Sequence, residues 1–263
     1  MNIILTKSLT ILGSVWKPIK RAIAWHLILN IYRLARLTSS PTLLMEEAWE
    51  NLIILDACRF DAFSVVNWIP GTLKKVISAG STTWEWFVNN FKDRKLDDVI
   101  YISANPFISS YHVRKWLGSI PFYKIIEVWR FGWNQKLKTV HPSTVNKATM
   151  IALKHYPGKK FIIHYLQPHY PFIGRLKLIG DEYVFNMLRS GKISVDFAWK
   201  AYLSNLEYVL IFVEKMLKYL RGNICITSDH GNAFGRFGVF YGHTANVPLP
   251  ELIEVPWLKI RND

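Results

Sequence analysis

Ile-Cys-Ile-Thr-Ser-Asp-His-Gly (residues 224–231) joins a short apolar run to an abrupt polar tail. This pattern predicts a buried β-strand that ends where the polar residues begin. In α/β proteins, chemistry is concentrated at the carboxyl ends of parallel strands. Asp229 and His230 would lie at such an end, where a carboxylate oxygen and an imidazole nitrogen can bind one cation. His243 comes after a glycine-spaced loop and could return to the same edge.

The length and charge of the chain limit its organisation and partners. Its 263 residues are within the range of a single α/β unit, and we expect a catalytic domain over 46–263 preceded by an appendage over 1–45. Lys and Arg total 33 against 19 Asp and Glu, a formal net charge of +14. This excess predicts attraction to an anionic partner, which could be nucleic acid, anionic lipid or a phosphorylated substrate.

The two cysteines indicate a redox compartment. Cys58 and Cys225 each lie in an apolar, strand-like context. Such residues fit buried thiols in a reducing compartment better than a disulfide framework. We therefore expect a cytosolic protein.

The first 45 residues contain no acidic side chain. Their most apolar run, 22–35, is interrupted by His26, Asn30 and Arg33 and is shorter than the roughly 20 residues of a membrane span. Charges recur throughout, unlike in a secretory signal. Two interpretations remain: a basic amphipathic helix peripheral to an anionic membrane, or a helix packed on its own domain. In the first, one face would carry Leu27, Ile28, Ile31, Leu34 and Leu37.

A second apolar run, Asn-Leu-Ile-Ile-Leu at 51–55, is closed by Asp56. A continuous run of this kind predicts a central parallel strand with both faces covered. Asp56 would then lie at a strand end, as Asp229 does. Taken alone, Asp56 would more commonly be a helix N-cap.

Strand-like and helical segments alternate along the rest of the chain, which predicts an α/β fold with a mostly parallel sheet. The clearest helix covers 196–220, and a short one is expected over 42–49. The stretch 105–140 has no clear assignment and could be an insertion over the site. Further strands are predicted at 74–78, 99–103, 125–129, 160–166 and 254–260.

Two further polar clusters follow predicted strands. Gly80 leads into Ser81, Thr82 and Thr83 just before an apparent helix. Hydroxyls there are ordinarily N-caps, although a hydroxyl at a helix N-terminus is also well placed to attack a phosphate. The second cluster is Gln-Pro-His-Tyr-Pro-Phe (167–172), in which prolines flank His169 on both sides.

These motifs together resemble the alkaline phosphatase superfamily, in its sulfatase-like branch and its phosphoglycerol and phosphoethanolamine transferases. The resemblance covers about 51–260, and its most specific part is Ser-Asp-His-Gly with the later Gly-His. It implies a three-layer α/β sandwich with helices on both faces of the sheet. It also implies a metal-dependent hydrolase or transferase that acts on a phosphate ester, or on a sulfate ester, through a covalent threonine intermediate.

Carried over residue by residue, the resemblance implies a set of roles. It makes Asp56, Asp229 and His230 the ligands of one divalent metal, Zn or Mn. The nucleophile falls within 81–83, with Thr83 first and Thr82 second. The transferring group or its leaving oxygen would contact His169 and His243, with Arg59 supporting the site.

The sequence also departs from the family pattern. No Cys-x-Pro-Ser-Arg motif is present, so the formylglycine chemistry of authentic sulfatases is not expected. Ala57 stands where those enzymes carry a second Asp, and no Asp-x-x-x-His pair for a second ion is evident. One metal is therefore the simpler prediction, although His169 and His243 could contribute to a second.

Two other functions compete with this interpretation. A nucleic-acid-binding protein would use the positive charge and the aromatic residues interleaved with Lys and Arg over 111–138. No recognised binding motif supports it. An inactive scaffold of the same fold is the other alternative, and the presence of every expected residue type argues against it.

Overall fold

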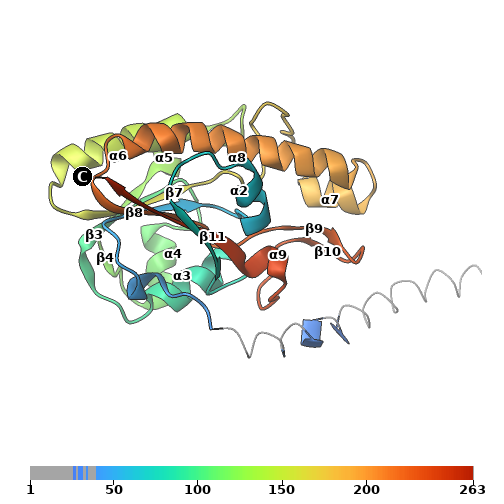
Figure 1. The fold of residues 1–263 in the computed structure, drawn as a ribbon, viewed down its shortest axis with the longest axis horizontal. Helices are drawn as coiled ribbons and strands as arrows, with labels where there is room; N and C mark the ends of the chain where they lie inside the picture. Colours follow the sequence, from blue (N-terminus) through green and yellow to red (C-terminus); the bar gives the residue numbers. More distant parts are fainter. Residues whose placement is uncertain (1–25, 28, 32–33, 35–39, 263) are drawn as a thin grey trace, which may run out of the picture.

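The computed structural model describes residues 26–27, 29–31, 34 and 40–262. A central sheet of seven strands runs through it in the order β2-β11-β8-β1-β7-β3-β4 (Figure 1). β1 is parallel to β7 and β8, and β3 is parallel to β4 and β7, whereas β11 is antiparallel to β2 and β8. The predicted mostly parallel sheet is confirmed. The strands are β1 (Asn51–Leu55), β2 (Thr72–Ile77), β3 (Leu96–Ser103), β4 (Phe122–Glu127), β7 (Lys160–Tyr165), β8 (Gly222–Thr227) and β11 (Glu254–Asn262).

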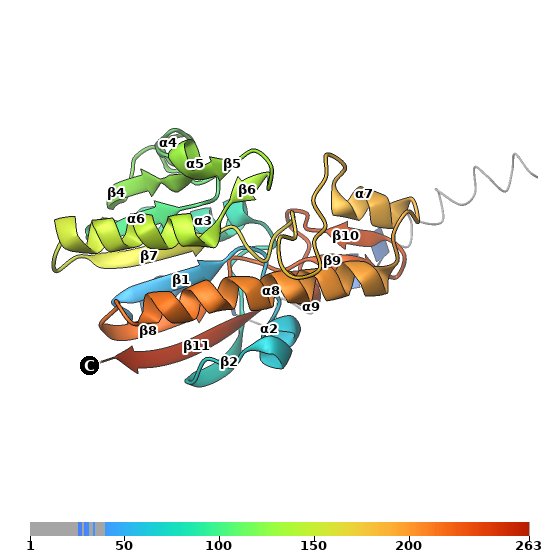
Figure 2. The same cartoon turned by 90° about the horizontal axis from the view of Figure 1, so that it is seen from above.

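Helices cover both faces of this sheet, because successive strand residues point to opposite sides. In β1, Ile53 and Leu55 belong to one buried cluster, while Leu52 and Ile54 belong to another. The first face packs against α2 (Phe60–Val66), α5 (Val128–Gly132), α6 (Pro142–His155) and α8 (Val195–Leu217). The second packs against α3 (Thr83–Phe91) and α4 (Ser110–Leu117) (Figure 2). The expected three-layer sandwich is confirmed.

The long helix α8 corresponds to the helix predicted over 196–220. Its apolar residues recur every three or four positions and are buried, including Leu206, Val209, Leu210 and Val213. This spacing places them on one side of a helix, facing the sheet. α8 also carries Tyr202 and Asn205, two buried polar side chains that reach the loops at the sheet edge.

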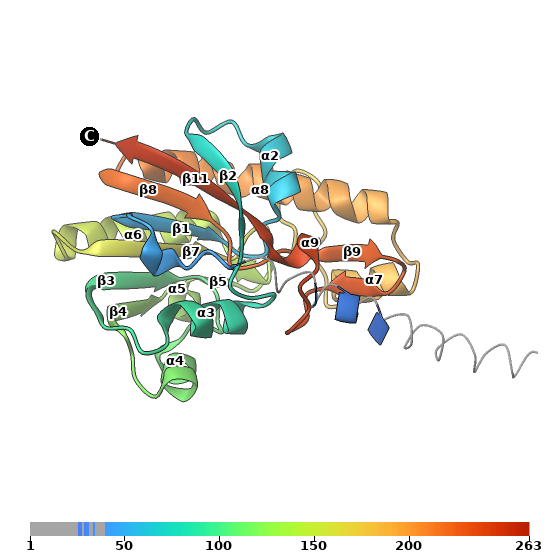
Figure 3. The ribbon, with the colours of Figure 1, turned by 60° about the horizontal axis from the view of Figure 1, so that its bottom comes forward.

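Smaller elements lie outside the sheet. Beyond the carboxyl end of β8 is the hairpin of β9 (Ala233–Arg236) and β10 (Phe240–Gly242), close to α7 and α9 (Figure 3). Among the described residues, none of the helices combines the length and apolar character that a membrane crossing requires. The other small elements are α7 (Val184–Arg189), α9 (Pro250–Ile253), the 3₁₀ helix η1 (Leu44–Glu46), β5 (Trp133–Asn134) and β6 (Thr139–Val140).

Part of the basic amino-terminal segment is described. Leu29 is buried in a cluster that includes Val247, Leu249 and Leu252. Three of the residues expected on the apolar face, Leu27, Ile31 and Leu34, are exposed by 61%, 64% and 66%. The other two, Ile28 and Leu37, lie outside the described residues.

Some local expectations differ from the structure. Instead of a helix over 42–49 there is only η1, because Thr42 N donates to Ile77 O and Leu44 N to Asn90 Oδ1, which ties the segment to its neighbours. The strand predicted at 125–129 begins earlier, at Phe122, and gives way to α5 at Val128. The stretch 105–140 is not simply an insertion, since it supplies α4, α5 and the edge strand β4.

Candidate active site

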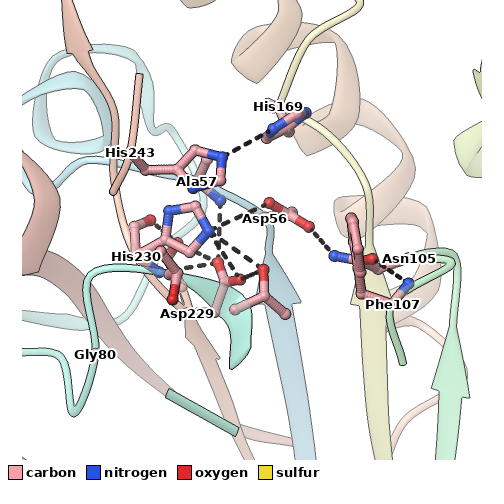
Figure 4. Close-up of polar contacts among 12 residues, drawn as sticks. Asp56, Ala57, Gly80, Asn105, Phe107, His169, Asp229, His230 and His243 are labelled. Atoms are coloured by element: carbon pink, nitrogen blue, oxygen red, sulfur yellow. Dashed lines mark hydrogen bonds and ion pairs between the residues drawn. The ribbon is translucent and has the colours of Figure 1, made fainter. Parts of the chain in front are cut away.

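The carboxyl ends of β1 and β8 bring Asp56 and Asp229 to the same edge of the sheet. The strands are paired in parallel with Ile54 opposite Thr227, so both chains leave the sheet at nearly the same level. The side chains of Asp56, Asp229 and His230 are at most 2% exposed. His230 Nε2 lies 3.3 Å from Asp229 Oδ2 and 3.9 Å from Asp56 Oδ1 (Figure 4). The structure therefore brings together all three residues predicted as metal ligands.

Thr83 joins this group from α3. It is the first residue of that helix, and its Oγ1 donates a hydrogen bond to Asp229 Oδ2 at 2.7 Å and lies 3.2 Å from His230 Nε2. We call Asp56, Asp229, His230 and Thr83 the acid–imidazole cluster. Because α3 begins at Thr83, the amino-terminal end of this helix, which favours anions, lies at the cluster.

The two neighbouring hydroxyls have other partners. Thr82 is the N-cap of α3, and its Oγ1 accepts from Glu85 N at 3.4 Å. Ser81 Oγ lies 2.7 Å from Glu85 Oε2 and 2.8 Å from Thr244 O, both of which can accept from it. Neighbouring Gly80 is required, since a Cβ there would come within 2.3 Å of Trp86 N. Of the three hydroxyls, that of Thr83 faces the carboxylate and imidazole groups.

Two residues not predicted from the sequence hold Asp56. Asn105 Nδ2 donates to Asp56 Oδ2 at 2.6 Å, and His164 Nε2 lies 3.6 Å from the same oxygen. Burial raises the pKa of Asp56, but the neighbouring imidazoles of His164, His169 and His230 outweigh it and hold this pKa well below its usual range. His164 interrupts the apolar run of β7, and a lone His in a buried strand was the available signal.

The turn after β1 is fixed from both sides. Ala57 has φ +60°, an unfavourable conformation for a residue with a side chain, and its N–H donates to Asp229 Oδ1 at 3.0 Å. The Tyr202 hydroxyl donates to Ala57 O at 2.8 Å and accepts from Arg59 N. Cys58 N donates to Ser228 Oγ at 2.8 Å. This turn links the strand ends that carry the two aspartates.

His169 and His243, which we call the histidine pair, lie next to the cluster. Their Nε2 atoms are 3.3 Å apart, and the ring centroid of His243 is 4.3 Å from that of His230 (Figure 4). His169 Nδ1 is 2.6 Å from Tyr170 O, so this nitrogen carries the proton and donates. Burial, followed by the neighbouring His230 and His169, lowers the pKa of His243 well below its usual range. His243 is therefore neutral near pH 7.

Loops position both members of the histidine pair. Asn205 on α8 donates from Nδ2 towards the carbonyls of Pro168, His169 and Pro171 and accepts from Ile173 N at 2.9 Å. The loop after His243 is held by the turn that precedes α3. There, Asn246 N donates to Glu85 Oε1 and Val247 N to Ser81 Oγ. Asn205 and Glu85 were not predicted, because neither lies in a recognisable motif.

Arg59, predicted to support the substrate, is already engaged. Its guanidinium pairs with Asp61, donates to Asn232 O at 3.1 Å and lies 4.7 Å from the ring centroid of Trp199. A role in substrate binding would require it to exchange one of these partners, and it stays a prediction.

The residues present fit a divalent cation. Asp56, His164 and Asp229 are buried and place ligand atoms within 4.8 Å of one another, so they could hold a metal ion. His230 Nδ1 is 2.9 Å from Gly231 O and donates to it, which leaves a lone pair on Nε2. Within the described chain no Lys or Arg pairs with either carboxylate, and two buried carboxylates need such compensation. Oxygen and imidazole donors suit Zn or Mn.

The sequence matches no protein-family model. It also matches no curated protein. Solved structures do match. The soluble domain of lipooligosaccharide phosphoethanolamine transferase A from Neisseria meningitidis has a TM-score of 0.55 at 12% identity, with 80% of this chain and 75% of that chain covered.

Two other structures agree. The C-terminal periplasmic domain of EcEptC from Escherichia coli, in complex with Zn, gives a TM-score of 0.51 at 14% identity over 81% of this chain and 72% of that chain. A putative sulfatase from Bacteroides thetaiotaomicron gives a TM-score of 0.51 at 9% identity, with 81% of this chain and 64% of that chain covered. The chain therefore has the alkaline phosphatase-like α/β fold, and the resemblance expected from its motifs is confirmed at the level of the fold.

Proposed function

We propose that this protein is a metal-dependent hydrolase or transferase that acts on a phosphate ester, with Thr83 as its nucleophile. The observation that carries the proposal is the position of the Thr83 hydroxyl, 2.7 Å from Asp229 Oδ2 and 3.2 Å from His230 Nε2 at the start of α3. A hydroxyl is a weak nucleophile unless a neighbouring group removes its proton or stabilises its alkoxide. The fold of phosphoethanolamine transferases supports a phosphoester substrate.

The first chemical step forms a bond between Thr83 Oγ1 and phosphorus and breaks the bond to the leaving alcohol oxygen. Asp229 Oδ2, the present hydrogen-bond acceptor of Thr83, is placed to take the hydroxyl proton. The N–H groups at the start of α3 favour the negative phosphoryl oxygens, as helix N-termini generally do. Water or an acceptor alcohol then attacks phosphorus and returns Thr83 to its hydroxyl form.

The histidine pair would stabilise the leaving oxygen. His169 keeps its proton on Nδ1, so its Nε2 accepts, and His243 Nε2 must be protonated where the two nitrogens are 3.3 Å apart. His243 Nε2–H can then donate a hydrogen bond to the leaving oxygen in place of His169 Nε2. Because His243 is neutral it keeps this proton, so the hydrogen bond stabilises the negative charge on the leaving oxygen and solvent protonates the departing alkoxide.

Asp56, Asp229 and His230 would hold the metal ion, Zn or Mn. His230 lies near Asp56 Oδ1, and His164 lies near the other oxygen of this carboxylate, Oδ2. When bound, a divalent ion lowers the pKa of a hydroxyl beside it and neutralises charge on a phosphoryl oxygen. A second ion at the histidine pair and a sulfate ester as substrate are the secondary forms of the proposal.

Replacement of the three hydroxyls tests the assignment of the nucleophile. Thr83→Ala should reduce phosphoesterase turnover by roughly 10³-fold or more, with metal content and thermal unfolding nearly unchanged. Thr82→Ala should cost about 1 kcal/mol of stability as a lost N-cap but leave most of the turnover. The measurements are turnover on phosphomonoester, phosphodiester and sulfate-ester chromogenic substrates, and metal analysis of each purified variant.

Trapping distinguishes the remaining outcomes. Protein quenched with substrate should carry phosphate on a peptide containing Thr83, as read by mass spectrometry. Phosphate on Thr82 or Ser81 would overturn the Thr83 assignment. Metal-loaded protein that turns over no ester would favour the inactive scaffold, and salt-sensitive binding of single-stranded nucleic acid by such a protein would favour the nucleic-acid alternative.

We further propose that the basic segment 1–45 attaches the protein to anionic membrane. Exposed Leu27, Ile31 and Leu34 support this, because apolar side chains beside basic residues suit a lipid interface. Each basic group near such a surface adds about 1 kcal/mol. Flotation with phosphatidylglycerol vesicles should fall with salt and disappear when residues 1–45 are deleted. Flotation that ignores lipid charge would instead favour the helix packed on its own domain.

The compartment is a separate prediction. Cys58 and Cys225 are buried and unpaired, as expected of a cytosolic protein. The similar E. coli structure is, in contrast, a periplasmic domain. Fractionation of cells that express the full chain would decide between the two locations.

A further inference from the structure

A groove runs between α6 and the edge strand β4, on a part of the molecule that the proposed chemistry does not use. Its volume is about 470 Å³, within the range of roughly 300–1,000 Å³ that holds small organic ligands. In Figure 2, α6 runs near the edge of the sheet that β4 forms. The lining residues, which together we call the α6 groove, are Lys124, Ile126, Phe131, Thr144, Lys147, Ala148, Ile151, Ala152, His155 and Tyr156.

The apolar part of the groove comes from helical spacing. Ile151 and Ala152 lie three and four residues after Ala148 and therefore share its side of α6. Ala148 and Ala152 are buried, and their small side chains leave the space open. The walls carry Phe131 and Ile151, which are 68% and 59% exposed. Large apolar side chains this exposed around a cavity are characteristic of a binding surface.

The polar part of the groove carries positive charge from Lys124 and Lys147. His155 also lines it, and none of the lining residues is acidic. Lys124 Nζ donates to the Tyr156 hydroxyl at 2.7 Å. Within the described part of the chain, neither Lys124 nor Lys147 forms an ion pair with a carboxylate. The groove thus presents positive charge beside an apolar channel.

We propose that the α6 groove binds a long-chain fatty acid anion. The apolar side of the groove would hold the acyl chain, while Lys147 and Lys124 would neutralise the carboxylate. The charge argues against the basic segment 1–45 as the occupant, because its Lys and Arg residues would meet the same cationic rim. It also disfavours a second copy of this strongly basic chain, whose net charge is +14.

The test is displacement of a dansyl-labelled undecanoic acid from the full-length protein by palmitate. Palmitate should displace the probe saturably and at least tenfold better than hexadecanol, which has a similar chain but no charge. Ala148→Trp should fill the channel and weaken probe binding at least tenfold. Lys147→Glu should weaken palmitate at least fivefold and leave hexadecanol unchanged.

Matched variants separate the groove from general effects. Ile211→Trp and Lys218→Glu introduce the same side chains, Trp and Glu, at exposed positions of α8 and its end, and both should bind the probe as the parent protein does. Thermal unfolding of each variant reports whether it is folded. If Ala148→Trp does not fold, Ala148→Ile places a smaller side chain in the groove. Phosphoesterase turnover should be unchanged in all of them, because the groove contains no residue of the candidate active site. The fatty acid proposal does not rest on the proposed function.

Several results would overturn the proposal. These are no saturable probe binding, equal affinity for palmitate and hexadecanol, or unchanged binding by a folded Ala148 variant. Binding to phosphatidylglycerol vesicles without binding of monomeric palmitate would assign the surface to membrane instead. A concentration-dependent dimer that the Ala148 variant disrupts would assign it to a second copy.

Discussion

The acid–imidazole cluster and the histidine pair lie side by side but are held in different ways. Asp56 and Asp229 follow directly from β1 and β8, and parallel pairing of these strands sets their separation. His169 and His243 lie on loops, and side chains from α8 and α3 hold those loops. The sheet therefore sets the positions of the two carboxylates of the cluster, whereas the histidine pair depends on contacts between distant parts of the chain.

This difference assigns separate tasks to the two regions. A metal ion needs ligands at a fixed separation, which the ends of paired strands provide. A substrate must enter and leave, and a loop can accommodate this more readily than a strand. We therefore expect loss of Asp56, Asp229 or His230 to remove both metal and turnover, and variants of the histidine pair to lose turnover alone.

The largest effect is expected for Asp229→Ala. This change removes a carboxylate that faces both Thr83 and His230, and water cannot replace its charge. Metal should fall well below one equivalent and turnover by roughly 10³-fold or more. Metal analysis and steady-state kinetics measure the two, with Asp97→Ala at an exposed position as control. An Asp229→Ala protein that retains stoichiometric metal would remove this residue from the ligand set.

An intermediate effect is expected for His169→Ala. His169 Nε2 contacts His243 Nε2, and loss of a group that orients a hydrogen-bond donor at the leaving oxygen should reduce turnover by roughly 10²–10³-fold. Metal content should be unchanged, because the cluster does not include His169. His169→Gln, which keeps a polar side chain, should recover part of the turnover. If metal is lost together with turnover, the histidine pair belongs to the metal site and the division between the two regions fails.

The smallest effect is expected for Asn205→Leu, which leaves both regions intact but removes the hydrogen bonds that hold the loop of His169. Unsatisfied buried groups should cost about 1–3 kcal/mol of stability. Turnover should fall about 10- to 100-fold, as is usual when a supporting group is lost. Denaturant unfolding and kinetics measure these changes.

Asn146→Leu is the matched control for Asn205→Leu. Asn146 donates to Phe212 O and accepts from the Tyr165 hydroxyl, away from the histidine pair. It should lower stability by a similar amount and leave turnover unchanged. Equal losses of turnover in both variants would show that Asn205 acts through overall stability alone.

Much of the fold could be predicted because each strand of the sheet has a local signal. The continuous apolar run at 51–55 indicated burial on both faces, and β1 is buried throughout. The failure at 42–49 has the opposite cause. There the backbone hydrogen bonds go to β2 and α3, and local sequence does not report partners that are distant along the chain.

The site was predictable where its residues follow strands and not where they support them. Asp56, Asp229 and His230 were found because each comes at the end of an apolar run. Asn105 and Asn205 were not found, because the role of an amide side chain depends on the groups it contacts, and these are distant along the chain. The position of Thr83 among three hydroxyls likewise depends on the direction in which α3 begins.

The sequence by itself determined the α/β class, the strands and the acidic and imidazole residues at their ends, because hydrophobic periodicity and abrupt polar ends are local properties of the chain. Only the tertiary structure decided which of these groups meet. It placed Thr83 rather than Thr82 or Ser81 against Asp229, brought His164 behind Asp56 and left Arg59 paired with Asp61. Contacts of this kind depend on strand order and loop packing, which join residues far apart in the sequence.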